Sequence, residues 1–222
     1  MRFSSIKDQL RLKASIILTV LTVLIIAQSA KAHHPFGGET PSNFFEGFLS
    51  GLGHPIIGLD HFAFILAVGL LGAKFKQGFL IPITFVMATM IGTGIHLQTI
   101  DLPYPEIIIA SSVIAFGSLL AKEKSDFFAS SISTIIIATI AIIAGIFHGY
   151  AYGEAVIGAE MSPIIAYLAG FAIIQLLCAF SAFGVAIVIS KKFQDKATFI
   201  LRMIGLAISG IGFAFFSFAF AA

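Results

Sequence analysis

The stretch GLGHPIIGLDHFAFILAVGLLGA, residues 51–73, is apolar enough to cross a bilayer, yet it contains three ionisable side chains. These are His54, Asp60 and His61. An ionisable side chain near the centre of a membrane costs at least about 2.5–3.5 kcal/mol on insertion scales, so a partner group, a cavity or an ion must compensate it. The stretch therefore predicts a membrane-spanning segment with a polar site inside it.

The composition of the whole chain also indicates a membrane protein. Of its 222 residues, 58% are hydrophobic and 11% are charged, and the mean hydropathy is +1.03. A soluble domain has about 25% charged residues. The single cysteine, Cys178, excludes an intramolecular disulfide and a multi-cysteine zinc site. The net charge of +2 gives no indication of nucleic-acid binding. We expect neither a prosthetic group nor an enzymatic activity.

Residues 1–32 have the features of a secretory signal peptide. A basic leader precedes an apolar core at 14–27, and Ala30-Lys31-Ala32 provides a small-x-small cleavage pattern. Cleavage there makes His33 the first mature residue. The alternative is an uncleaved anchor helix, since the apolar core is long for a signal. Both interpretations place the residues that follow outside the cytoplasm.

Residues 33–222 predict a single all-α domain with six transmembrane helices. Each apolar segment is long enough to cross about 30 Å of hydrocarbon as a helix. An exterior segment at 33–52 precedes the first of them, and an interfacial helix could begin there at Asn43. The predicted spans are 53–73, 78–98, 104–121, 127–148, 162–190 and 199–221.

Positive charge fixes the predicted direction of these spans. Every Lys and Arg beyond the signal follows an odd-numbered span. Lysine and arginine are enriched in cytoplasmic loops, so we expect a multi-pass protein of the bacterial inner or plasma membrane with its mature N- and C-termini outside the cytoplasm. The basic residues are Lys74, Lys76, Lys122, Lys124, Lys191, Lys192, Lys196 and Arg202.

This topology places all six histidines in or near the outer half of the domain. His54 and His61 are seven residues apart and would share one face of a continuous helix. Pro55 suits the first position of that helix, which would make His54 its N-terminal cap. Imidazole and carboxylate groups suit Ni²⁺, Zn²⁺, Co²⁺ or Cu²⁺, and the absence of a Cys or Met cluster argues against Cu⁺. The three polar residues of the first span therefore predict a divalent-metal site.

One helix cannot supply a full set of ligands, so other residues must complete the site. His96 is equally explained as a hydrogen-bonded contact between helices, and the adjacent histidines at 33–34 as an accident of the cleavage region. A purely structural role is also the alternative for the Asp60–His61 pair. The further candidate ligands are His148, Glu154, His96, His33 and His34.

The segment HPIIGLDHFAFILAVG, residues 54–69, resembles the HPxxGxDHxxxxxxxG signature of the HupE/UreJ family and matches every fixed position. The resemblance extends over nearly the whole chain. It implies a nickel permease associated with hydrogenase or urease maturation, with His54, Asp60 and His61 at its site. The family's second motif, FHGxAHGxE, is matched only in part by FHGYAYGEA, because Tyr152 replaces its histidine and Glu154 comes one place early.

We therefore predict a secondary permease or channel that imports a divalent transition-metal ion, with Ni²⁺ as the leading candidate. One alternative is a non-transporting membrane subunit that assists metalloenzyme assembly. Another is a permease for Co²⁺, Zn²⁺ or Mn²⁺. A homo-oligomer and metalloenzyme maturation proteins are the partners that the sequence leaves open, together with the choice between a channel and proton-coupled transport.

Overall fold

The computed structural model describes residues 40–123 and 125–221, and every regular element in these two ranges is helical. The predicted all-α class is confirmed. The predicted signal peptide, His33 and His34 lie outside the described residues. The elements are α2 (Phe44–Ile57), α3 (Leu59–Gly72), α4 (Leu80–Leu97), α5 (Pro105–Ala121), α6 (Asp126–Ala129), α7 (Ser131–Gly153), the 3-10 helix η1 (Glu154–Val156), α8 (Met161–Lys192) and α9 (Ala197–Ala221).

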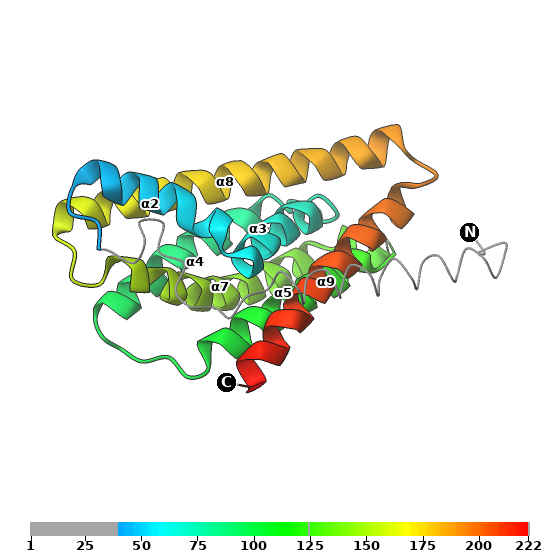
Figure 1. Cartoon of the computed structure of the whole chain (residues 1–222). Helices are drawn as coiled ribbons and strands as arrows, with labels where there is room; N and C mark the ends of the chain where they lie inside the picture. Colours follow the sequence, from blue (N-terminus) through cyan, green and yellow to red (C-terminus); the bar gives the residue numbers. More distant parts are fainter. Residues whose placement is uncertain (1–39, 124, 222) are drawn as a thin grey trace.

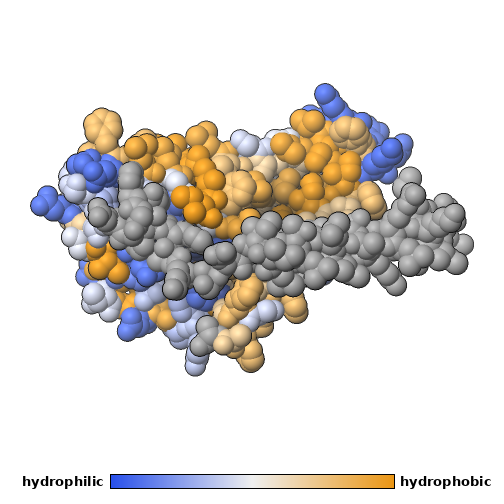
Figure 2. All heavy atoms as spheres, viewed as in Figure 1, coloured by the Kyte–Doolittle hydropathy of each residue, from blue (hydrophilic) through white to orange (hydrophobic). Residues whose placement is uncertain are grey.

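Several of these helices are long and apolar enough to cross a membrane. Four qualify, namely α4, α7 with η1, α8 and α9, and the bent pair of α2 and α3 would make a fifth. Helix α5 is also apolar, but at 17 residues it is shorter than the four candidate spans. Large hydrophobic side chains are exposed along α7 and α8, and in Figure 2 hydrophobic residues cover much of the upper part of the visible face, with hydrophilic ones toward its left and right ends. This pattern indicates a multi-pass membrane protein.

The helices pack in three close pairs, as Figure 1 shows for α2 and α8. Helix α2 and then α3 lie along α8, α4 lies along α7, and α5 lies along α9. Glycines permit this closeness: a Cβ on Gly51 would overlap the carbonyl of Tyr167, and one on Gly92 would overlap the carbonyl of Ile146. Small residues at helix interfaces are common in membrane bundles.

The relative directions of these pairs agree with the predicted alternation of spans. Helices α4 and α7 are parallel, because Gly145 lies against Phe85 and Gly149 against Thr89. Helices α2 and α3 are 80° apart, but each advances along α8 in the direction of the chain, with Gly51 against Tyr167 and Gly69 against Ala179. Helices α5 and α9 are antiparallel, because Gly117 lies against Gly205 and Gly212 against Ile114. These are the directions expected if odd-numbered spans run one way and even-numbered spans the other.

The prediction of one continuous first span at 53–73 is wrong. Helix α2 begins earlier, at Phe44, where the side chain of Asn43 accepts a hydrogen bond from the backbone of Glu46 at 3.0 Å. The chain then leaves the helical region at Gly58 (φ −70°, ψ 103°), and α3 continues at an angle of 80°. Pro55 therefore lies in the last turn of α2, and His54 is not an N-terminal cap.

A helix does begin just after its cap Asn43, as the sequence predicted, but it continues to Ile57 and so includes the start of the predicted first span. A Cβ on Gly47 would overlap the carbonyl of Pro163, so the start of α2 packs directly on α8. The fourth span differs as well. A short helix, α6, precedes it, and α7 continues to Gly153. His148 is therefore inside the helix, not at its outer end as predicted.

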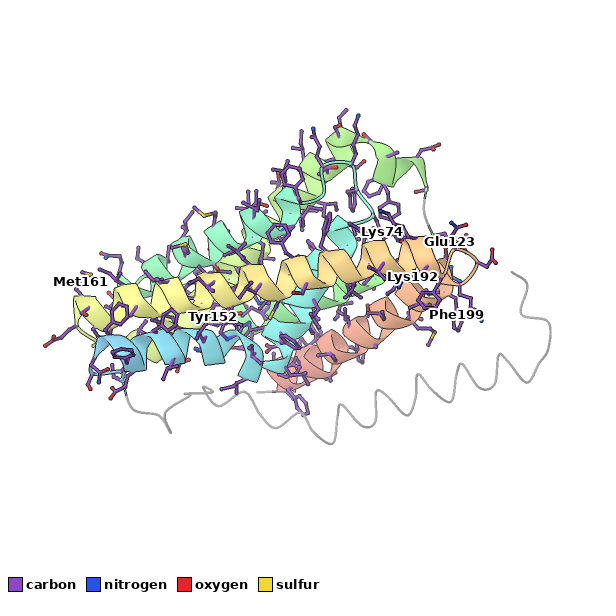
Figure 3. The ribbon with its side chains drawn as sticks, turned by 90° about the horizontal axis from the view of Figure 1, so that it is seen from above. Lys74, Glu123, Tyr152, Met161, Lys192 and Phe199 are labelled. Carbon is purple, nitrogen blue, oxygen red and sulfur yellow. The ribbon has the colours of Figure 1, made fainter. Side chains whose placement is uncertain are left out.

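The basic connections meet at one end of the molecule. The Lys74 ammonium donates to the carbonyls of Leu120 (3.1 Å) and Lys122, and Arg202 pairs with Glu123 at 3.0 Å. Figure 3 shows Lys74, Glu123 and Lys192 at this end and Met161 at the opposite end. We call these the basic end and the opposite end.

Candidate functional site

The break between α2 and α3 positions the three polar residues predicted from the first span. His54 lies in the last turn of α2, and Asp60 and His61 lie in the first turn of α3. Their exposed fractions are 6%, 6% and 8%. A Cβ on Gly58 would lie 2.7 Å from Cδ2 of His61, so only glycine leaves room for this imidazole beside the break.

The two imidazoles lie close together for a reason other than the predicted one. They cannot share a face of one helix, because the helix is broken between them. Their ring centroids are nevertheless 6.4 Å apart. Tyr152 of α7 contacts both rings, with centroids 5.2 Å from His54 and 4.5 Å from His61. Tyr152 lies inside the bundle near α2 and α8 (Figure 3).

Asp60 supplies negative charge at the start of α3. Its Oδ1 accepts a hydrogen bond from the backbone N–H of His61 at 2.9 Å, a position that the helix dipole favours. The carboxylate is near enough to Tyr152 and Glu106 to interact with both electrostatically. Glu154 also acts on Glu106, and both glutamates are exposed. The candidate ligand Glu154 is thus an exposed acid near Glu106.

His148 joins the cluster from α7 and is fully buried. Its Nδ1 lies 2.8 Å from Nδ1 of His61, and its Nε2 lies 3.0 Å from Oγ of Ser112. Its ring stacks on Phe64 at 4.5 Å. The structure therefore brings His148 to His61, as predicted, but both of its ring nitrogens already have protein partners.

Aromatic rings close the cluster on the side of the basic end. Phe64 lies one helical turn beyond His61 on α3, and its centroid is 5.0 Å from that of Phe85 and 4.7 Å from that of Phe116. All three rings are buried.

The hydroxyl of Tyr152 is buried and has no hydrogen-bond partner among the residues that the structure describes. A buried donor or acceptor left in this state costs about 1–3 kcal/mol. Native proteins contain few such groups, and each one needs an explanation such as an ion or a water molecule. The unpartnered hydroxyl is attached to the ring that contacts both imidazoles.

His96 is placed elsewhere. It lines a pocket of about 200 Å³ together with Asp101 and Tyr150, and its ring packs on Tyr150 at 4.2 Å. That His96 completes the site of the first span stays a prediction. Within residues 40–123 and 125–221, no three His, Cys, Asp or Glu side chains are arranged to hold a metal ion as they stand.

Besides Tyr152, two more polar residues that contact the histidines were not predicted from the sequence. Tyr167 of α8 donates its hydroxyl to the carbonyl of Tyr152 and contacts Nδ1 of His54, both at 2.9 Å. Ser112 of α5 contacts His148. The chain has only four tyrosines, and a buried tyrosine usually needs a hydrogen-bond partner, which is the one signal that could have indicated Tyr167. A lone serine in an apolar span gives no comparable signal.

Comparisons with known proteins agree with the motif in the first span. Residues 21–215 match the family described as HupE / UreJ protein. The chain is 30% identical over 205 residues to Protein HupE of Rhizobium leguminosarum bv. viciae, an alignment that covers 91% of this chain and 98% of that protein. No solved structure matches. The match over most of its length shows that the chain belongs to the HupE/UreJ family.

Proposed function

We propose that this protein is a permease that imports Ni²⁺ or a similar divalent ion through His54, Asp60 and His61. One observation carries the proposal: beside the buried break at Gly58, the imidazoles of His54 and His61 both contact Tyr152, whose hydroxyl has no hydrogen-bond partner among the described residues, and Asp60 adds a buried carboxylate to the same segment. Non-helical backbone at membrane depth is tolerated only where protein buries it or where it lines a cavity. Broken helices form the ion and substrate sites of many transporters.

The spacing of the two imidazoles fits a shared ion. With metal–nitrogen bonds of about 2.0–2.1 Å, the centroids of two imidazoles on one ion lie about 5 Å apart at a tetrahedral angle and about 6.4 Å apart on opposite sides of the ion. Those of His54 and His61 are 6.4 Å apart, which matches ligands on opposite sides of the ion, and a tetrahedral site would need the rings to approach by about 1 Å. Asp60 would supply negative charge after a small movement, and the Tyr152 hydroxyl would supply one more oxygen. Nitrogen ligands of this type suit Ni²⁺, Co²⁺ and Zn²⁺.

The site would be reached from the opposite end of the molecule. The exposed acids Glu106 and Glu154 attract cations there, while the rings of Phe64, Phe85 and Phe116 must separate before an ion can continue. A membrane potential would drive import, because a divalent ion gains about 4.6 kcal/mol per 100 mV, at about 2.3 kcal/mol per charge.

Flux measurements on the isolated protein test this function. Proteoliposomes that contain only this chain should take up Ni²⁺, and an inside-negative potential should increase the rate. Co²⁺, Zn²⁺ and Mn²⁺ are measured in parallel, with protein-free liposomes as the control. Faster uptake of another ion would keep the permease and change its substrate. No flux of any of the four ions would instead favour a non-transporting membrane subunit that assists metalloenzyme assembly.

The proposed permease has six spans, with α5 as a short one, the basic end in the cytoplasm and both mature termini outside. In a Cys178→Ala background, a Glu160→Cys variant should react with a membrane-impermeant thiol reagent added to intact cells. A Glu123→Cys variant should react only after the cells are opened. Glu160 precedes α8 at the opposite end, and Glu123 lies at the basic end (Figure 3). The reverse pattern would place the proposed site on the wrong side of the membrane.

A further inference from the structure

A chain of hydrogen bonds runs from α5 through α7 to α3. The hydroxyl of Ser112 donates to the carbonyl of Ile109 at 2.6 Å, since a carbonyl can only accept. A serine hydroxyl has one hydrogen, so Oγ of Ser112 must accept its second bond, the 3.0 Å contact with Nε2 of His148. His148 therefore carries its hydrogen on Nε2.

This assignment determines which nitrogen of His61 carries a hydrogen. His148 is fully buried against the rings of Phe64 and Phe85, where an unpaired charge is very costly, so its imidazole is neutral and its Nδ1 can only accept. In the 2.8 Å contact between the two Nδ1 atoms, His61 must then be the donor. A neutral imidazole has one N–H, which leaves the lone pair of His61 on Nε2.

A second, separate chain acts on His54 in the same way. The hydroxyl of Tyr167 donates to the carbonyl of Tyr152 at 2.9 Å. Its oxygen must therefore accept the 2.9 Å hydrogen bond from Nδ1 of His54. His54 also carries its hydrogen on Nδ1 and its lone pair on Nε2. Two chains, each ending at a backbone carbonyl, thus give both imidazoles of the first span the same tautomer.

We infer that Ser112, His148 and Tyr167 are positioning residues, and that the ion-binding atoms are Nε2 of His54 and Nε2 of His61. Metal-ligating histidines generally donate their other N–H to an acceptor that fixes the tautomer and the ring orientation. The inference rests on the proposed function, in that it names the ligand atoms of that site. It also changes the role of His148. The sequence predicted His148 as a ligand, whereas in this inference it orients the ligand His61.

Matched serine variants test the longer chain. Ser112→Ala removes the acceptor of His148, so His148 can carry its hydrogen on Nδ1 and force His61 to the opposite tautomer. We expect the dissociation constant for Ni²⁺ to rise about 10–100-fold, the usual effect of losing such a partner. Ser112→Thr keeps the hydroxyl and should restore binding. Ser111→Ala changes an exposed neighbour on the same helix and should have no effect.

Spectroscopy separates this inference from the function on which it rests. Nitrogen-15 NMR of the ion-free protein in nanodiscs should show Nδ1–H on His54 and His61 and Nε2–H on His148. X-ray absorption of the Ni²⁺ complex should show two imidazole ligands. Failure of the unmodified protein to bind any divalent ion would contradict the proposed function. Binding by the unmodified protein that Ser112→Ala leaves unchanged, or Nδ1–H on His148, would overturn the positioning inference alone.

Discussion

Asp60→Asn should reduce ion uptake at least about 100-fold while the protein remains folded in the membrane. Asparagine has nearly the same size, and its Oδ1 can still accept the hydrogen bond from the backbone of His61 that begins α3. Only the negative charge is lost. A neutral amide is also cheaper to bury than a carboxylate, so the stability of the ion-free protein should stay the same or rise.

The size of this effect follows from the charge of the ion. Two unit charges 4 Å apart interact by about 4 kcal/mol at an effective dielectric constant of about 20, and the value doubles for a dication. Desolvation of the ion offsets part of this attraction. A remaining loss of about 2.8 kcal/mol already corresponds to a 100-fold change, at about 1.4 kcal/mol per factor of ten.

Uptake into proteoliposomes, normalised to the amount of folded protein, measures the effect. Asp126→Asn is the matched control, because it makes the same chemical change on α6, close to the basic residues and away from the histidines. It should transport normally. Normal transport by a well-folded Asp60→Asn variant would show that Asp60 serves helix packing and that the site has been assigned wrongly.

Tyr152→Phe should make the ion-free protein more stable and should weaken ion binding. The change deletes one oxygen that has no hydrogen-bond partner among the described residues, so it removes a penalty of about 1–3 kcal/mol. The ring and its contacts with His54 and His61 remain. If this oxygen binds the ion, the affinity for Ni²⁺ should fall about tenfold or more, the equivalent of about 1.4 kcal/mol.

Tyr167→Phe is the matched comparison, since Tyr167 is equally buried but its hydroxyl is hydrogen-bonded on both sides. This variant should be less stable, because it leaves the carbonyl of Tyr152 and Nδ1 of His54 without their partner. Thermal unfolding in detergent measures both variants. A loss of stability in Tyr152→Phe would mean that the hydroxyl is hydrogen-bonded in the ion-free protein and is not an unoccupied ligand for an ion.

Tyr152→His tests the departure from the family motif at the same position, by ion uptake into proteoliposomes. It places an imidazole where that motif has a histidine, and imidazole favours Ni²⁺ and Zn²⁺ over Mn²⁺ more than an oxygen ligand does. Competition by Mn²⁺ against Ni²⁺ uptake should therefore decrease. Unchanged competition would show that the side chain at position 152 does not contact the ion.

The sequence by itself determined the class of protein and the location of its polar site. Apolar segments of membrane-spanning length and the one-sided lysines and arginines are local properties, and each can be read without knowing which helices touch. The burial cost of charge singled out Asp60 and His61 for the same reason. The family motif then named the group to which the chain belongs.

The tertiary structure decided how the site is built. The sequence contains Pro55 and Gly58, but its apolar pattern continues through them without a sign of the 80° break, so the spacing of His54 and His61 suggested one continuous helix. Tyr167 and Ser112 are distant in sequence from the histidines that they orient, and only the packing of α8 and α5 brings them there. Hydrogen bonds between helices depend on three-dimensional proximity. A uniformly apolar sequence does not show which face of one helix packs against which face of another.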